Sequence, residues 1–174
     1  MNTIENSNEI KTSRTGGFGG SDAEMFYGIA LKGLSAINVT YKKRIRVAKG
    51  IDEYKPISTP AMQKGHDFED WYAEQPFAPL NFEREKKIEK QLAVNFKTFA
   101  HADFFSCETD DLRNSEVWEL KCVSDPDNCM NDYIYQLQWY YMMGVDKVWL
   151  VVCDSRMSSF QDGVKMPVLV HRNE

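Results

Sequence analysis

The stretch VWELKCV, residues 117–123, places one acid and one base inside an apolar run. Glu119 and Lys121 lie two positions apart, so they point to the same side if this stretch is a strand. Large apolar residues on both sides predict that the strand is interior, where unpaired charge is costly and usually has a partner or a metal ion. The spacing by itself carries no information, because Glu-x-Lys occurs four times in the chain and the other copies lie in polar surroundings.

Asp103 is the candidate partner of this pair. It lies in a second apolar stretch, TFAHADFFSC (98–107), and the acidic turn CETDDLRN between the two stretches predicts a hairpin that brings Asp103 near Glu119. Two converging carboxylates repel each other unless a divalent cation lies between them, and Mg²⁺ prefers oxygen ligands. Lys121 would then orient a water or stabilise charge on a phosphate. A buried ion pair with Lys121 explains the same residues, and the residues alone leave both interpretations open.

The length and composition favour one domain. The chain has 174 residues, of which 43% are hydrophobic, so we expect a single domain over residues 1–174 with a flexible polar segment at residues 1–13. Neither a secretory signal nor an apolar run of ~18 residues is visible, so we expect a cytoplasmic protein without a membrane span. The four cysteines lack the close spacing of a zinc or iron–sulfur site, and we expect them to be reduced thiols.

Charge is unevenly distributed along the chain. The net charge of −5 argues against a protein that simply coats nucleic acid. However, residues 41–50 carry five basic residues, and residues 103–127 carry eight acidic ones. This combination fits an enzyme that holds a phosphate backbone in one place and a metal in another. For an isolated charge run, however, a solvated helix or loop surface is the favoured explanation.

The expected order of elements is helix, helix, several strands, helix and strand, which predicts an α/β or α+β fold with helices packed on a sheet. Helices are expected within 15–33, 58–76 and 124–144, and strands near 86–94, 97–106, 115–123, 147–154 and 164–172. Ser21 and Glu24 form a predicted capping box after the glycine-rich turn, Thr59 and Asp125 are the other predicted caps, and Gly144 ends the last helix. The first helix start is a place where a phosphate could bind, but a simple turn and cap is the favoured explanation.

These residues together form a recognisable pattern. Asp103 followed by Glu119-Leu120-Lys121 resembles the signature of the PD-(D/E)XK nuclease superfamily, and within it the phage-type exonucleases related to lambda exonuclease and the YqaJ viral recombinases. In KGHDFED, Gly65 and Glu69 are similar to the G-x-x-x-E of the preceding helix, and YIYQLQWYYMMG is similar to the glutamine helix that follows the E-x-K strand. Arg14 and Ser21 resemble the residues that hold a terminal 5′ phosphate in this group. The motifs occur in the family's order from residue 14 to residue 152.

The resemblance implies a restriction-endonuclease-like core, with a central mixed β-sheet flanked by helices, and a role for each matching residue. Asp103, Glu119, Glu69 and the carbonyl of Leu120 would bind Mg²⁺ or Mn²⁺, and Lys121 would position the attacking water. One glutamine would contact the scissile strand or the lysine. Gln136 and Gln138 cannot both do so, because residues two apart on a helix point in nearly opposite directions. In one respect the chain departs from the pattern, since Ala102 replaces the proline before the first acid.

The implied activity is metal-dependent hydrolysis of DNA from a 5′ end, as in phage recombination. By the same resemblance the partners would be double-stranded DNA ends, a single-strand annealing protein and further copies of the chain in a trimeric ring. A PD-(D/E)XK endonuclease for DNA repair or degradation is the alternative enzyme. The alternative that is not an enzyme is a catalytically inactive DNA-binding protein of the same fold.

Overall fold

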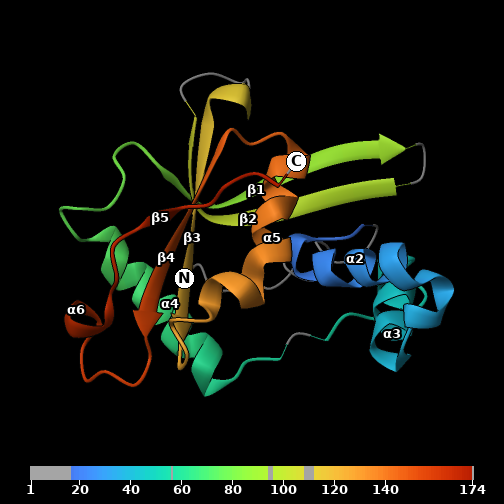
Figure 1. Cartoon of the computed structure of the whole chain (residues 1–174), viewed down its shortest axis with the longest axis horizontal. Helices are drawn as coiled ribbons and strands as arrows, with labels where there is room; N and C mark the ends of the chain where they lie inside the picture. Colours follow the sequence, from blue (N-terminus) through green and yellow to red (C-terminus); the bar gives the residue numbers. More distant parts are fainter. Residues whose placement is uncertain (1–16, 56, 94–95, 108–111, 174) are drawn as a thin grey trace, which may run out of the picture.

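The protein is described by a computed structural model that covers residues 17–55, 57–93, 96–107 and 112–173. The predicted flexible segment 1–13 lies outside these residues. Five strands form one mixed sheet in the order β1-β2-β3-β4-β5, with helices on both faces (Figure 1). The strands are β1 (Glu83–Ala93), β2 (Phe96–Cys107), β3 (Ser115–Val123), β4 (Lys147–Asp154) and β5 (Val168–Leu169). The predicted α+β fold with a mixed sheet is confirmed.

The pairing of the strands makes the sheet mixed. β1, β2 and β3 are successively antiparallel, β3 and β4 are parallel, and β5 is antiparallel to β4. The parallel pair follows from the chain order, because α5 (Cys129–Met143) is the crossover between β3 and β4. The predicted strand at 164–172 is reduced to two residues, since Pro167 has no N–H to donate to the ladder.

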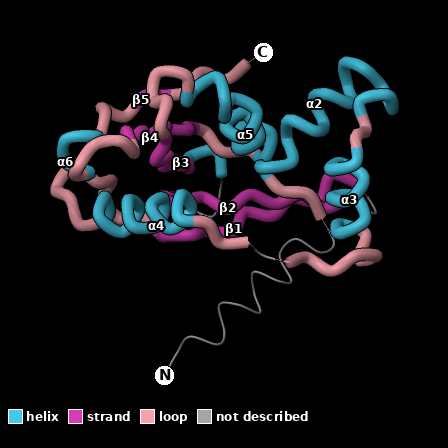
Figure 2. Tube along the Cα trace, turned by 90° about the horizontal axis from the view of Figure 1, so that it is seen from below, coloured by secondary structure: helices cyan, strands magenta, loops and turns pink. Residues whose placement is uncertain are grey.

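Two helices cover the two faces of the central strands. α5 packs on the face that carries Val117, and Leu137 and Tyr140 of the helix belong to that core. α4 (Pro60–Ala73) packs on the opposite face, where Phe68 and Leu120 belong to a second core. Figure 2 shows α4 and α5 on opposite sides of β3 and β4. The alternation along β3 therefore directs Glu119 and Lys121 toward α5.

The helix starts agree only in part with the predicted caps. Thr59 caps α4 as predicted, accepting a hydrogen bond from the N–H of Met62. The predicted start of α5 near Asp125 is wrong. Pro126 disfavours a helical conformation for the residue before it, a turn follows, and α5 begins only at Cys129. Gly144 ends α5 as predicted, with a left-handed φ of 106°.

The predicted capping box of Ser21 and Glu24 is also wrong. A short 3-10 turn, η1 (Gly20–Asp22), precedes α2 (Ala23–Lys32), and the buried carboxylate of Asp22 accepts the N–H of Gly19 at 2.8 Å. Arg44 holds the same carboxylate through Nε–Oδ1 and Nη2–Oδ2 contacts of 2.6 and 2.7 Å. A turn that begins at Gly19 and is held by this charge-assisted pair thus replaces the predicted helix start at Ser21.

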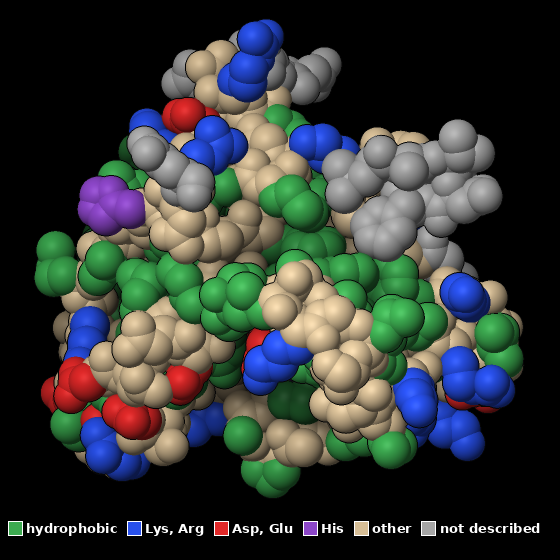
Figure 3. All heavy atoms as spheres, turned by 45° about the vertical axis from the view of Figure 1, so that its right-hand side comes forward, with side chains coloured by type: hydrophobic (Ala, Val, Ile, Leu, Met, Phe, Trp, Pro, Cys, Tyr) green, Lys and Arg blue, Asp and Glu red, His purple; other side chains and the backbone are tan. Residues whose placement is uncertain are grey.

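Arg44 belongs to a helix that the sequence analysis did not predict, α3 (Val39–Ala48), which follows the 3-10 turn η2 (Gly33–Ala36). The basic run at 41–50 lies largely on α3, and Asn38 caps it by accepting the N–H of Tyr41. In Figure 3, which brings this end of the molecule forward, Lys and Arg side chains gather at the lower right. The 3-10 turn η3 (Leu112–Asn114) and the short α6 (Phe160–Gly163) complete the elements. Within the described ranges, no helix has the length and apolar character needed to cross a membrane.

The Asp22–Arg44 pair should contribute strongly to stability, because both side chains are largely buried, with 6% and 14% exposure. We expect Arg44→Ala to lower the free energy of unfolding by about 3 kcal/mol, since it leaves a buried carboxylate without its partner. Urea unfolding would measure the change. Arg46→Ala is the matched control on the same helix. Its pair with Asp52 is exposed, so no measurable loss is expected. Equal effects of the two substitutions would contradict this assignment.

Candidate active site at the divergence of β2 and β3

The site lies where β2 separates from β3. The ladder between these strands runs from Cys107↔Ser115 to Phe104↔Trp118, whereas β2 continues to pair with β1 as far as Phe96. At the next position the carboxylate of Asp103 accepts the N–H of Leu120 at 2.7 Å. The carboxylate of Asp103 thus takes the place of a backbone acceptor, and this hydrogen bond fixes Asp103 beside β3.

Glu119 is the most constrained group of the site. It is 1% exposed, and its carboxylate accepts three hydrogen bonds. Oε1 accepts from Lys121 Nζ at 2.5 Å and from Gln136 Nε2 at 2.6 Å, and Oε2 accepts from the Tyr140 hydroxyl at 2.5 Å. The Tyr140 hydroxyl also lies 2.6 Å from the carbonyl oxygen of His101. Charged and polar partners thereby offset the desolvation of a buried carboxylate.

α5 supplies these partners from one stripe. Tyr133, Gln136 and Tyr140 are three and four residues apart, a spacing that places them on one side of a helix. Tyr133 contacts the ammonium group of Lys121 with its ring, at 5.1 Å from Nζ to the ring centroid. Tyr133 was not among the predicted site residues. The helical spacing with Gln136 and Tyr140 is the signal that could have identified it.

Glu69 reaches the site from α4. Its side chain is 14% exposed, and Nδ1 of His66 lies 3.6 Å from its carboxylate. Burial raises the pKa of Glu69, against the opposing effect of His66, and the charges of Lys121 and Glu119 act on it too. Glu69 is therefore close enough for the charges of Lys121 and Glu119 on β3 to affect its pKa.

The electrostatics show a shortage of positive charge. Burial, and then the negative charge of Glu119, raise the pKa of Asp103 well above its usual value. Burial alone would lower the pKa of Lys121, but the carboxylates of Glu119 and Asp103 outweigh it and raise that pKa. Three carboxylates thus share one ammonium group, an arrangement that favours protons or a cation.

The donor set suits a hard divalent cation, since its members are carboxylate oxygens. In the arrangement described, both oxygens of Glu119 are bound to Lys121, Gln136 and Tyr140. Over the described residues, no three His, Cys, Asp or Glu side chains are grouped as ligands of one ion. The chemistry of the donors therefore fits, and binding would require Glu119 to exchange at least one of its partners.

The backbone of Leu120 also belongs to the site. Its side chain is buried in the core beside α4, and its N–H binds Asp103. In an extended strand the N–H and C=O of one residue point to the same side. The carbonyl that was predicted as a ligand is therefore directed toward Asp103.

Gln136 and Gln138 have separate environments. Gln136 binds Glu119, whereas Gln138 donates to the carbonyl of His171 at 2.7 Å and accepts the N–H of Asn173. Only Gln136 faces the site, in agreement with the expectation that the two glutamines point in different directions. Gln138 instead attaches the C-terminal segment to α5.

A cavity of about 530 Å³ opens beside the acidic cluster. Its lining includes Ser21, Arg44, His66, His101, Gln136 and Tyr140. Ser21 is exposed at this cavity, as its predicted role requires, but Arg14 lies outside the described residues. His66 and His101 were left out of the predicted site.

Packing fixes the glycine-rich loop that forms one wall of the cavity. A Cβ at Gly19 would lie 2.7 Å from the ring of Phe99, and one at Gly17 would lie 2.9 Å from the carbonyl oxygen of Lys97. The loop therefore approaches β2 more closely than any other residue type would allow. This contact places Ser21 next to Gln136, the neighbour of Gly20 in the cavity wall.

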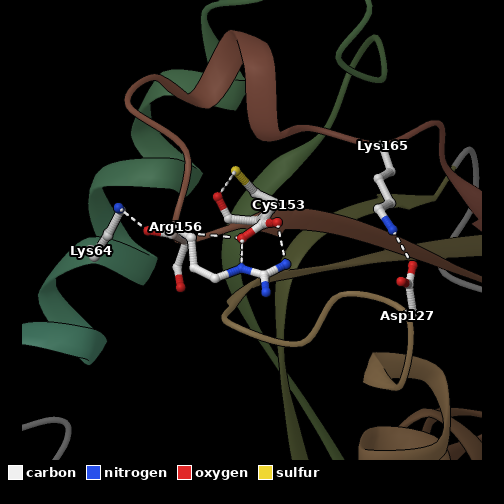
Figure 4. A network of polar contacts seen from close by, with 7 residues as sticks. Lys64, Asp127, Cys153, Arg156 and Lys165 are labelled. Atoms are coloured by element: carbon white, nitrogen blue, oxygen red, sulfur yellow. Dashed lines mark hydrogen bonds and ion pairs between the residues drawn. The ribbon is translucent and has the colours of Figure 1, made fainter.

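Polar contacts near the C-terminal end of β4 include one that joins α4 to the segment after β4 (Figure 4). Lys64 of α4 donates to the carbonyl of Ser155 at 2.5 Å, directly after β4. Asp154 accepts hydrogen bonds from the backbone and the guanidinium of Arg156, which lower the pKa of Asp154 to about 2. The contact of Lys64 thereby helps to fix α4, the helix that carries Glu69.

Solved structures with a similar fold include exonucleases. An alkaline exonuclease from Laribacter hongkongensis, LHK-Exo, matches with a TM-score of 0.62 at 15% identity, over 95% of this chain and 82% of that one. The same enzyme in complex with dAMP matches at 18% identity. A phage-related exonuclease from Haemophilus somnus 129PT matches with a TM-score of 0.55 at 13% identity, over 90% of this chain and 85% of that one.

The chain has the fold of these exonucleases. This confirms the fold that the resemblance to phage-type PD-(D/E)XK exonucleases implied. At such low identity the match establishes the exonuclease fold alone. No protein-family model matches the chain, and neither does any curated protein sequence.

The raised pKa of Asp103 gives a testable effect on stability. A carboxyl whose pKa is higher in the folded than in the unfolded state binds protons more tightly when folded, so stability falls as the pH rises above about 4. We expect Asp103→Asn, which can still accept the Leu120 N–H, to raise the melting temperature at pH 8 in EDTA and to flatten its decline with pH. Asp146→Asn, at an exposed position, is the control and should change neither. A less stable Asp103→Asn protein at pH 8 would contradict the electrostatic account.

Proposed function

We propose that the chain is a metal-dependent deoxyribonuclease that hydrolyses DNA from a 5′ end. The observation that carries this proposal is the cluster of Asp103, Glu119, Lys121 and Glu69, which has more carboxylates than cations. It lies beside a cavity whose lining includes Gln136 and Tyr140, the partners of Glu119, and His66, the neighbour of Glu69. The fold of the chain supports it, because LHK-Exo and the phage-related protein are exonucleases. The bound dAMP of LHK-Exo suggests a nucleotide as the group that such a site accommodates.

In this proposal the carboxylates of Asp103, Glu119 and Glu69 and the carbonyl of Leu120 hold Mg²⁺ or Mn²⁺. When bound, the ion would polarise the scissile phosphate and lower the pKa of a water. Lys121, kept charged by its acidic neighbours, donates hydrogen bonds that orient the water and stabilise negative charge on the phosphate. Gln136 contacts the scissile strand or keeps Glu119 in position.

The cavity would hold the end of the attacked strand. Ser21, with Arg14 from the segment before the described residues, would bind the terminal phosphate. The basic helix α3 beside the cavity would contact the duplex backbone, because Lys and Arg neutralise phosphates without regard to sequence. Assembly into a trimeric ring and cooperation with a single-strand annealing protein, in phage recombination, are further parts of this proposal that rest on the resemblance.

Cleavage assays on linear and covalently closed DNA test the proposal directly. We expect Mg²⁺ to support release of 5′-mononucleotides from linear DNA, and EDTA to abolish it. Glu119→Gln should lower the rate by at least about 10²-fold, because it removes the charge that holds the ion. Glu116→Gln is the matched control on β3, since Glu116 pairs with Lys147 at the protein surface. Equal cleavage of closed circles would indicate an endonuclease, and binding without cleavage would indicate an inactive DNA-binding protein.

The role of the terminal phosphate has its own test. Arg14→Ala and Ser21→Ala should each lower the preference for 5′-phosphorylated over 5′-hydroxyl ends by roughly tenfold, because each removes one hydrogen bond to a charged group. Initial rates on matched duplexes would measure it. Ser35→Ala, whose hydroxyl binds the carbonyl of Lys32, is the control and should leave the preference unchanged. Equal losses on both kinds of end would argue against a 5′-phosphate site.

A further inference from the structure

Lys121 needs a support other than Glu119 if the site is to hold a metal. Among the residues that the structure describes, two contacts hold its ammonium group, the hydrogen bond to Glu119 Oε1 and the ring of Tyr133. The same Glu119 oxygen also accepts from Gln136, so little capacity remains for an ion. An ion bound there would compete with Lys121 for that oxygen, and the ammonium group would lose its strongest attachment.

The contact with Tyr133 does not depend on that oxygen. A cation is attracted to the face of an aromatic ring within about 6 Å of the centroid, and the attraction is stronger where water is excluded. Nζ of Lys121 lies 5.1 Å from the Tyr133 centroid, and the lysine side chain is only 17% exposed. The ring therefore attracts the ammonium group whether or not Glu119 is engaged elsewhere.

The ring of Tyr133, rather than its hydroxyl, makes the contact with Lys121. Its hydroxyl makes no hydrogen bond to the described part of the chain, so the contact with Lys121 is the specific interaction of this side chain. The backbone of α5 sets its position, and the same helix fixes Glu119 through Gln136 and Tyr140. One rigid element thereby holds both members of the Glu119–Lys121 pair.

We propose that Tyr133 is a positioning residue that keeps the Lys121 ammonium group directed into the site when Glu119 binds a metal. This inference rests on the proposed nuclease function. It predicts a specific defect: without the ring, substrate and metal still bind, but Lys121 spends less time in the orientation that the reaction needs. The loss should therefore appear in kcat, with KM little changed.

Three substitutions at this position separate the ring from the hydroxyl. We expect Tyr133→Phe and Tyr133→Trp to retain most of kcat, and Tyr133→Leu to lose about 10- to 30-fold with KM within about twofold. Tyr135→Leu is the matched control, because Tyr135 lies two residues away on α5 and stacks on Tyr27 instead. A merely structural role for Tyr133 would lower activity in proportion to the fraction of unfolded protein, which thermal unfolding measures for each variant.

A signal from Lys121 itself gives an independent readout. The ring current of Tyr133 should shift the ε-methylene resonance of Lys121 upfield in the protein labelled with ¹³C-lysine, and Lys121→Arg identifies the signal by its loss. The shift should persist in Tyr133→Phe and in Tyr135→Leu and disappear in Tyr133→Leu. This measurement needs neither DNA nor metal, so it reports on the contact even in a variant with no activity.

The outcomes distinguish this inference from the proposed function. If the wild-type protein cleaves DNA and Lys121→Arg or Glu119→Gln is impaired, but Tyr133→Leu equals Tyr135→Leu in kcat, the positioning role is wrong and the nuclease remains. An unshifted Lys121 resonance in the wild-type protein would also overturn it. Absence of cleavage by the wild-type protein would overturn the proposed function, and with it the role of Tyr133 in catalysis.

Discussion

A carboxylate with almost no access to solvent, that of Glu119, is the constraint on which the rest of the site depends. Its desolvation has to be offset from within the protein, and three donors from β3 and α5 do so. The bonds of Gln136 and Tyr140 help to fix the rotation of α5 over the sheet, together with the packing of Leu137 in the core. The geometry of the site and the packing of α5 on the sheet therefore depend on each other.

The separation of β2 from β3 gives that carboxylate its neighbours. Continued pairing would have used the N–H of Leu120 in a backbone ladder and closed the sheet over this position. Instead Asp103 accepts the N–H, and Glu69 of α4 lies close enough for its charge to act on Asp103. The negative charges of the site therefore gather where β2 and β3 have separated.

The sequence was informative where a pattern has one physical meaning. The apolar frame around Glu119 and Lys121, the hairpin from Asp103 and the cap at Thr59 all follow from local chemistry, and the structure contains each of them. The cap at Asp22 could not be predicted, because it depends on Arg44, which is distant in sequence. α3 was missed because its run of basic residues was interpreted by its charge, although Tyr41, Ile45 and Ala48 in it have helical spacing. Tyr133 was overlooked because an aromatic residue on a helix usually indicates core packing.

The glycine-rich loop has a consequence for how the protein folds. Phe18 forms a bridge with Thr98, and Gly20 packs on α5. The loop therefore contacts segments that lie much later in the sequence. It can settle only after β2 and α5 have met. Contacts between such distant segments form slowly, since closing a long loop lowers the entropy of the chain before any contact compensates for it. The wall of the cavity should therefore be among the last parts of the domain to become ordered during folding, and among the first to open when the native state fluctuates.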